Sequence, residues 1–424
     1  MIKFIKIIFV IFSLFLIFLI LYKLKNYDKL YDITSHKYYL KYYFISFSFL
    51  VFSFLIKFIN EDIVIRFFLV SLSIATGLYL IEITLNLKEF FNRGNDKRSI
   101  LKVYKDELKI NKNTTVTLPP MSFLNRDYNL LPLSHISNNF IIDCNELGYY
   151  AINKSDKYGF NNENKIWNKK IDFVVIGDSF SYGQCVFRKD NIVSNLKLNE
   201  KKNILNLSMP GNGLLLNFAT LKEYLPNIKT NDILWFINDM DFENLIFEKK
   251  ERILLNYLYM KNFSQDLVNN EDEILKIQKD LFKKRNNKLP FESFLLLNKT
   301  KIFVNNIYSF ISNKTFDKIV YSGELEKISQ DIFEELGILK NKGYNIYIIH
   351  IPIKNKLFDK NYDDKFKVIT KDLSEKNYLN FMTVEEIFEK LDLNEKLNFY
   401  SKYHGHFTEE GYKKISNYIY KNLN

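Results

Sequence analysis

The architecture of this chain is set by Asp172-Phe-Val-Val-Ile-Gly-Asp-Ser-Phe-Ser-Tyr-Gly-Gln-Cys-Val186. The apolar run from Phe173 to Ile176 is rich in β-branched residues, which predicts a buried parallel strand. The run breaks at Gly177, and Asp178-Ser179 stand where a helix would begin. Open α/β sheets bind ligands at this end of their strands, and the first N–H groups of a helix suit a developing oxyanion. Ser179 is therefore placed for chemistry; the simpler alternative is a strand–turn–helix joint that Ser179 caps.

Short apolar strands and helices alternate along the C-terminal half of the chain. Strands are predicted at 203–207, 232–237 and 345–351, and helices at 214–224 and from Thr408 onward. Such alternation predicts an α/β fold with a parallel sheet covered by helices on both faces. A charged, mostly helical stretch at about 243–318 is predicted to be an insertion.

The composition argues against one class of partner. The chain has 424 residues, a formal net charge of +11 and 47% hydrophobic residues. Nucleic-acid binding requires basic residues gathered in a patch or motif, but the lysines here are spread evenly among Asn, Ile and Phe. We therefore expect no nucleic-acid partner. No metal or nucleotide cofactor is implied either.

Residues 1–91 are predicted to form a transmembrane region in contact with the lipid bilayer. Its three helices are expected at about 5–22, 40–58 and 64–86. No cleavage site follows the apolar run 7–22, so an uncleaved anchor is favoured over a signal peptide. Each uncharged run is shorter than the ~20 residues of a usual span, but snorkelling Lys and Arg side chains extend it. The alternative is a group of buried helices in a soluble protein.

The charges that flank these helices predict an orientation. Five lysines follow the first helix and four basic residues follow the third, whereas the opposite side carries four basic residues in all. By the positive-inside rule, this count places the C-terminal domain in the cytoplasm.

Residues 92–156 are predicted to form a linker and a lobe packed on the main domain. The chain has two cysteines, Cys144 in this lobe and Cys185 six residues after Ser179. They are too few for a disulfide scaffold and lack metal-site spacing. They either form one bridge or remain free thiols. A bridge would tie the lobe to the helix after Ser179 and would require an oxidising compartment.

Four short blocks occur in order, most of them at strand ends. They are Gly177-Asp178-Ser179, Asn206-Leu-Ser-Met-Pro-Gly211, Asn238-Asp239 and His404-Gly-His406-Phe-Thr-Glu-Glu-Gly411. This set resembles the SGNH/GDSL hydrolase family, whose blocks contribute a Ser, a Gly, an Asn and a His in that order. The similarity covers residues 157–424, and Ser155-Asp-Lys-Tyr-Gly-Phe-Asn-Asn162 is similar to the usual lead-in. The resemblance implies a three-layer, flavodoxin-like α/β/α domain.

The resemblance also implies a role for each block. Ser179 would be the nucleophile, with an oxyanion hole formed by its own N–H, the N–H of Gly211 and the amide of Asn238. Elementary chemistry agrees, because glycine permits close approach of the backbone and an Asn amide is a neutral donor. The alternatives are a plain turn glycine at 211 and a helix cap at 238.

His406 would be the general base that a weak hydroxyl nucleophile requires. His404 is a competing base, and His350 on its apolar strand is predicted to be a core or strand-end residue. The family carries an Asp two or three residues before the His, where this chain has Tyr403 and His404. Three outcomes remain open: a Ser–His dyad oriented by a backbone carbonyl, an acid supplied from elsewhere, or a lost activity.

The resulting functional hypothesis is a membrane-anchored serine esterase, O-acyl hydrolase or O-acyltransferase that uses Ser–His acyl-enzyme chemistry. The resemblance implies that its substrate is an acylated glycan, such as a surface polysaccharide or its precursor, or a small ester. The resemblance also favours a multi-pass protein of the bacterial inner membrane with a periplasmic catalytic domain. This orientation is the opposite of the one that the count of basic residues predicts. Long domains translocate largely regardless of charge. The alternative is a non-catalytic glycan-binding or assembly scaffold that lacks the triad acid.

Overall fold

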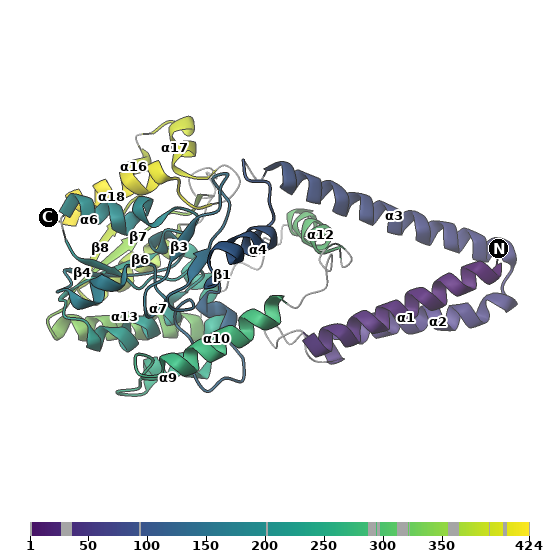
Figure 1. Cartoon of the computed structure of the whole chain (residues 1–424), viewed down its shortest axis with the longest axis horizontal. Coiled ribbons are helices and arrows are strands. Elements are labelled where there is room, and N and C mark those ends of the chain that lie inside the picture. Colours follow the sequence, from purple (N-terminus) through teal and green to yellow (C-terminus); the bar gives the residue numbers. More distant parts are fainter. Residues whose placement is uncertain are drawn as a thin grey trace. The chain divides into compact units, whose positions relative to one another are not determined.

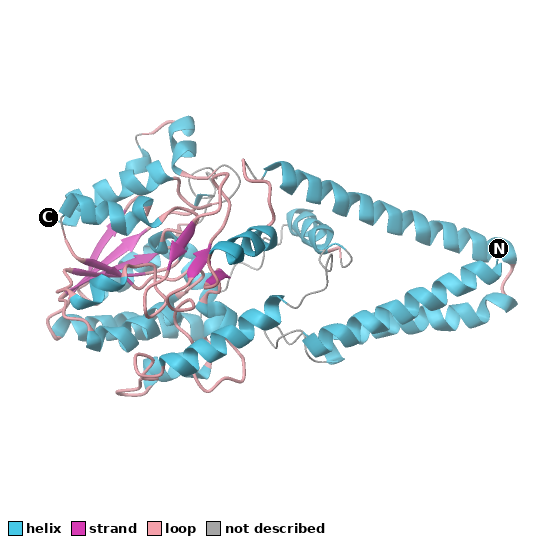
Figure 2. Ribbon diagram, viewed as in Figure 1, coloured by secondary structure: helices cyan, strands magenta, loops and turns pink. Residues whose placement is uncertain are grey.

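The computed structural model describes residues 2–26, 36–92, 95–200, 202–286, 294, 297–311, 321, 323–354, 364–389, 391–401 and 405–423. The chain forms two compact units. The helical unit comprises Met1–Phe91 and Lys283–Lys318, and the α/β unit comprises Asn92–Phe282 and Ile319–Asn424. All the described strands lie in the α/β unit (Figure 1, Figure 2).

The helical unit contains α1 (Ile2–Asn26), α2 (His36–Leu55), the 3-10 turn Ile56–Phe58, α3 (Glu61–Asn92) and α12 (Asn298–Ile311). Helices α1 and α2 lie side by side, and the Ser13 hydroxyl donates to the Ser46 carbonyl (2.6 Å) between them. Among the described residues, two stretches are long and apolar enough to cross a membrane, Ile2–Tyr22 and Glu61–Phe91. The apolar stretch Tyr42–Phe58 is shorter. Three spans therefore remain a prediction.

A five-stranded parallel sheet forms the centre of the α/β unit. Its strands are β4 (Phe173–Ile176), β5 (Ile204–Asn206), β6 (Asp232–Ile237), β7 (Asn345–His350) and β8 (Asn380–Thr383). They are ordered β5-β4-β6-β7-β8. In chain order this is 2-1-3-4-5, the flavodoxin-like arrangement, whose ligand crevice lies outside the carboxyl ends of the first and third strands. The predicted parallel sheet is confirmed, and the crevice falls between the ends of β4 and β6.

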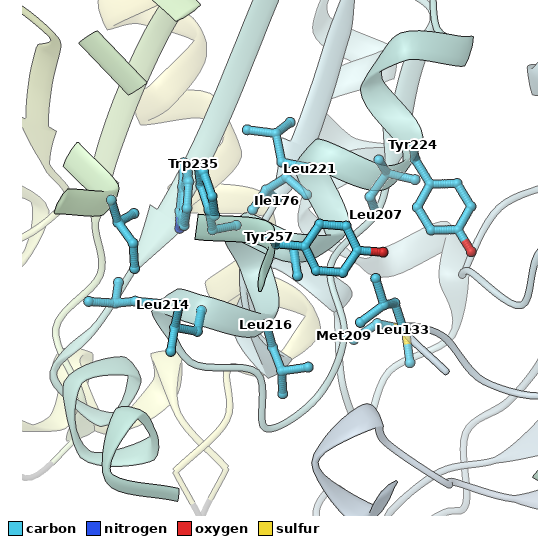
Figure 3. Packing of buried hydrophobic residues seen from close by; sticks show 14 of the residues in the cluster. Leu133, Ile176, Leu207, Met209, Leu214, Leu216, Leu221, Tyr224, Trp235 and Tyr257 are labelled. Carbon is cyan, nitrogen blue, oxygen red and sulfur yellow. The ribbon is translucent and has the colours of Figure 1, made fainter. Parts of the chain in front are cut away.

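Residues alternate between the two faces of the sheet, so each face has its own core. Val174 and Ile176 belong to one buried cluster, and Phe173 and Val175 belong to the other. Helices α7 (Leu214–Tyr224) and α13 (Glu324–Asn341) cover the first face, and α6 (Ile192–Glu200) and α18 (Glu409–Leu423) cover the second (Figure 1). Figure 3 shows Ile176 and Trp235 of the sheet among leucines of α7. The sheet and the helices on its two faces therefore form three layers.

The other described helices of this unit are α4 (Ile100–Ile110), α5 (Ser179–Tyr182), α8 (Asp239–Glu248), α9 (Arg252–Tyr259), α10 (Glu271–Asn286), α15 (Lys365–Lys376), α16 (Glu386–Glu389) and α17 (Leu393–Phe399), with 3-10 turns at Pro120–Phe123, Asn164–Asn168, Arg188–Asp190 and Leu225–Asn227. Of the predicted insertion at 243–318, α9 and α10 pack on the first core through Leu254, Tyr257 and Leu281. Its residues 283–318 belong instead to the helical unit.

The lobe carries a small sheet that is fastened to the main one. Strand β2 (Phe140–Ile142) pairs in parallel with β1 (Thr114–Val116) and antiparallel with β3 (Ile152–Lys154). After β3, the lead-in residue Asn162 exchanges two hydrogen bonds with the backbone of Asn206, at 2.8 and 2.9 Å. The end of β5 is therefore fixed before its loop turns toward the crevice.

Candidate active site

Ser179 is the first residue of α5, directly after β4. Asp178 caps this helix, because its Oδ1 accepts a hydrogen bond from Phe180 N at 2.9 Å. The cap is therefore Asp178, and the alternative in which Ser179 serves as the cap is wrong. Glycine is required at 177 because a Cβ there would lie 2.8 Å from the Phe236 carbonyl oxygen. The turn presents Ser179 at the carboxyl end of β4.

The Asp178 carboxylate joins the ends of β4 and β6. Its Oδ2 accepts hydrogen bonds from Ser179 Oγ at 3.3 Å and from Asn238 Nδ2 at 2.7 Å. The carboxylate is buried, and this burial raises the pKa of Asp178 despite these donors. Two of the predicted site residues, Ser179 and Asn238, are thus held together on one carboxylate at the crevice.

Asn238 has two roles in the structure. Its Oδ1 accepts from Met240 N at 2.8 Å, and its backbone N–H donates to Asp241 Oδ2 at 3.2 Å. These contacts form a capping box for α8, so the helix-cap alternative holds. The amide nitrogen has two N–H groups, and Asp178 takes one of them. The second is the group that an oxyanion could use.

Gly211 lies in the loop after β5, next to the Ser179 turn. Met209 N donates to the Gly177 carbonyl at 3.0 Å, which joins the two loops. The φ angle of Gly211 is 76°, a left-handed conformation that favours glycine. A Cβ at this position would meet only Met121 Cε, at 4.0 Å. The space beside the Gly211 backbone is therefore open.

His406 is presented by a short loop between α17 and α18. Tyr400 and Phe407 form an isolated antiparallel bridge, and Ser401 N donates to the His406 carbonyl at 2.8 Å. The His406 ring lies 5.5 Å, centroid to centroid, from the ring of Phe180, the residue after Ser179. The structure thus brings the imidazole next to α5. The hydroxyl of Ser179 donates its hydrogen bond to Asp178 and not to His406. Hydrogen bonds between a nucleophile and its base are often long or poorly aligned before substrate binds.

Glu146 of the lobe provides a carboxylate for His406. Its Oε1 lies 2.8 Å from His406 Nδ1, and its Oε2 accepts from Ser401 Oγ at 2.8 Å and from His406 N at 3.4 Å. The Glu146 side chain is only 8% exposed. Of the three outcomes left open by the sequence, the geometry matches an acid supplied from elsewhere, and this acid precedes the histidine by 260 residues.

A disulfide joins Cys144 to Cys185 and fastens Glu146 to the Ser179 region. The neighbouring Asp143 strengthens this link, because it accepts from Gln184 Nε2 at 3.2 Å and from Cys185 N at 3.4 Å. The segment that carries Glu146 is therefore held by one covalent bond and two hydrogen bonds to the chain just beyond α5.

The charges around His406 favour its protonated form. Burial alone would lower the pKa of His406, but the hydrogen bond and charge of Glu146, with the charges of Asp178 and Asp143, raise it above its ordinary value. An imidazole that gains affinity for a proton in this way is a stronger base. It needs a carboxylate on Nδ1 to leave Nε2 free for the nucleophile.

Cys144, Glu146, Cys185 and His406 form a cluster whose ligand-type atoms all lie within 4.8 Å of one another. Metal ions bind cysteine as the thiolate, and both sulfurs are consumed by the disulfide. In this oxidation state the cluster does not fit a metal ion.

Two other histidines can be assigned. His350 is buried at the end of β7, with Nε2 3.3 Å from Asp239 Oδ1, which agrees with the strand-end prediction. His135 is buried in the lobe, with Nδ1 3.0 Å from the Leu118 carbonyl, and burial lowers its pKa to about 4. His404, the competing base, lies outside the described residues.

Glu146 is the residue of this site that the sequence did not reveal. Neither its spacing nor its neighbours match a hydrolase block. The one available signal was Cys144, two residues earlier, since a bridge to Cys185 would bring this part of the lobe to Ser179.

No protein-family model matches the chain, and no curated protein matches it. Solved structures are similar to a part of this chain. The lipase/acylhydrolase from Enterococcus faecalis has 10% identity and a TM-score of 0.33, over 60% of this chain and 95% of that one. A protein of Desulfitobacterium hafniense, described as lipolytic and of the G-D-S-L family, has 12% identity and a TM-score of 0.30, over 59% of this chain and 98% of that one.

Proposed function

We propose that the chain is a serine esterase or O-acyltransferase of the SGNH/GDSL type, with Ser179, His406 and Glu146 as its catalytic triad. The observation that carries the proposal is the 2.8 Å contact between Glu146 and His406 Nδ1. It gives the imidazole a fixed orientation beside the helix that begins with Ser179. A serine at a strand end, an oriented imidazole and convergent N–H donors are the parts that acyl transfer requires.

The proposed reaction proceeds through an acyl-enzyme. Ser179 Oγ attacks the ester carbonyl carbon, and His406 Nε2 accepts the hydroxyl proton while Glu146 holds Nδ1–H. The N–H groups of Ser179 and Gly211 and the second N–H of Asn238 receive the oxyanion; one such donor contributes roughly 3 kcal/mol to transition-state stabilisation. His406 returns the proton to the leaving alcohol. Water or a sugar hydroxyl then attacks the acyl-enzyme.

The proposal includes a membrane anchor and an extracytoplasmic catalytic domain. The two span-length helices support the anchor, and the Cys144–Cys185 disulfide supports an oxidising compartment. A surface polysaccharide or its precursor is the proposed substrate, on the family resemblance of the four blocks.

A fluorophosphonate probe tests the chemistry directly, because it forms a covalent bond with an activated serine and releases fluoride. We expect labelling of the wild type and of the matched control Ser194→Ala, whose serine lies in α6. Ser179→Ala and His406→Ala should lose labelling.

The second candidate is a non-catalytic scaffold, which the bond between Ser179 Oγ and Asp178 favours. In that case the folded wild type would remain unlabelled. This result would refute the proposal that the chain is a serine esterase or acyltransferase.

A further inference from the structure

The apolar helix α3 contains a fully buried carboxylate, Glu82. Its Oε2 accepts hydrogen bonds from Thr300 N and Thr300 Oγ1, both at 2.8 Å, and its Oε1 lies 3.4 Å from Lys299 N. These N–H groups belong to the first turn of α12, where the helix dipole favours an anion. An ionisable side chain in a span-length helix is costly unless it is paired. Here α12 provides the partner.

Three further contacts fasten the start of α12 to the same part of α3. Thr300 Oγ1 also lies 3.4 Å from the Leu78 carbonyl oxygen. The Lys299 ammonium pairs with the Glu89 carboxylate. Just before α12, the ring of Phe294 lies 5.6 Å from that of Tyr79. The contacts on α3 thus run from residue 78 to residue 89, close to the end from which the chain enters the α/β unit.

Beyond its first turn, α12 presents apolar side chains that the protein does not cover. Phe303, Val304 and Ile307 are 41%, 49% and 41% exposed. Their spacing of three and four residues places them on one side of the helix, whereas Lys301 projects about 110° away from the centre of that side. Nearby residues of α3 that are exposed and apolar include Leu80, Ile83 and Leu87. Exposed apolar faces of this kind mark surfaces that contact lipid or protein.

We propose that α12 is an interfacial membrane helix, docked to α3 through Glu82, with Phe303, Val304 and Ile307 in the lipid. This inference rests on the membrane anchoring proposed above. An amphipathic helix of this kind lies at the boundary of the headgroups and the acyl chains. The chain then leaves the α/β unit after α10, contacts the bilayer and returns before α13.

Tryptophan quenching by brominated lipid tests the location of α12. The full chain is reconstituted in phosphatidylcholine vesicles with bromines near the headgroup end of the acyl chains. The signal of the native Trp167 and Trp235 is subtracted as the wild-type background. Phe303→Trp and Ile307→Trp should be quenched at least about twofold more than the matched control Lys301→Trp. Leu72→Trp, on the exposed surface of α3, reports the anchor itself.

The outcomes separate the two proposals. An unquenched Leu72→Trp would contradict membrane anchoring. A quenched Leu72→Trp, with both α12 reporters at the level of Lys301→Trp, would overturn the interfacial helix alone and indicate that protein covers this face.

Glu82→Ala tests the docking in the Phe303→Trp background. The Glu82→Ala variant should cut the quenching by at least half, whereas Glu89→Ala, which removes the partly exposed ion pair with Lys299, should change it less. Equal quenching in the Glu82→Ala variant would overturn the docking role of Glu82.

Discussion

Glu146 is bonded to both sides of the loop that presents His406, through Ser401 Oγ, His406 N and His406 Nδ1. No other part of the proposed triad comes from the lobe. In a serine protease, replacing the triad acid by its amide lowers kcat about 10⁴-fold, because the imidazole takes the wrong tautomer. We expect Glu146→Gln to lower kcat/KM for a short-chain aryl ester by between ~10² and ~10⁴. Stopped-flow or steady-state ester hydrolysis measures this loss.

The pH profile separates a triad acid from a merely structural residue. The base must be neutral to accept a proton, so the raised pKa of His406 moves the acid limb of kcat/KM to a higher pH than an unperturbed histidine would give. Removing the Glu146 charge should move this limb to lower pH while the rate falls. Glu409→Gln is the matched control, since Glu409 binds the Tyr149 hydroxyl at 2.5 Å on the surface. An unmoved acid limb in Glu146→Gln would refute the assignment.

Glu248 provides a prediction about stability. This buried carboxylate accepts hydrogen bonds from Gly213 N (2.6 Å) and Leu215 N (2.9 Å) at the start of α7, and burial raises its pKa to about 7. Between its ordinary pKa and about 7, the folded state keeps a proton that the unfolded state has lost. The free energy of unfolding therefore falls as pH rises through this window, by on the order of 3 kcal/mol.

Thermal unfolding of the detergent-solubilised full chain at pH 4.5 to 8 measures this dependence. Other buried carboxylates contribute to the slope in the same direction, so the relevant quantity is the difference in Tm between the wild type and Glu248→Gln. The Tm of the wild type minus that of Glu248→Gln should rise as the pH falls from 8 to 4.5, because the wild type regains the stability that the buried charge removes whereas the amide does not titrate. A difference that is independent of pH would show that Glu248 does not titrate in this window.

Among the secondary-structure elements, the disulfide is the covalent link between the lobe and the chain just after α5. Removing it leaves the two hydrogen bonds of Asp143 in place, so the lobe should remain attached but less precisely placed. A misplacement of about 1 Å can cost ~10² in rate. We expect Cys144→Ser/Cys185→Ser to lower kcat/KM for the aryl ester about 10²-fold with KM little changed.

A double-mutant cycle shows whether the disulfide acts through Glu146. If it does, breaking the bridge in the Glu146→Gln background should cost little more, because the positioned group is already absent. If the fold losses in kcat/KM of the disulfide variant and of Glu146→Gln multiply in the combined variant, the bridge stabilises the lobe in general and has no specific effect on Glu146.

The elements of the sheet could be predicted because their signals are local. The apolar runs that became β4, β6 and β7 each carry their own pattern, and the predicted ends lie within one residue of those observed. Strands β4 and β6 are parallel, so their carboxyl ends, and with them Ser179 and Asn238, lie at the same edge of the sheet. Glu146 could not be predicted, since its contact with His406 depends on the path of the lobe over the sheet. Likewise, only the folded chain shows that residues 283–318 belong with the N-terminal helices.

For the whole molecule, two signals disagree about the side of the membrane on which the α/β unit would lie if the proposed anchor is correct. The basic residues around the N-terminal helices favour a cytoplasmic α/β unit, but the Cys144–Cys185 disulfide is stable only where thiols are oxidised. We give the disulfide more weight in this proposal, because a domain of this length translocates largely regardless of charge. Cys185 is also fully buried beside His406, so the bridge belongs to the interior of the proposed site.

Reporter fusions at the C-terminus settle this conflict. Alkaline phosphatase needs its own disulfides and is active only outside the cytoplasm, whereas green fluorescent protein exported in unfolded form does not fluoresce. We expect an active phosphatase fusion and a dark fluorescent fusion. In parallel, the wild type should migrate faster without reductant than with it, and Cys144→Ser/Cys185→Ser should show no such difference. A bright fluorescent fusion together with free thiols would place the α/β unit in the cytoplasm. Glu146 would then approach His406 without a covalent link between the lobe and the chain after α5, and hydrogen bonds such as those of Asp143 and Ser401 would hold it in place.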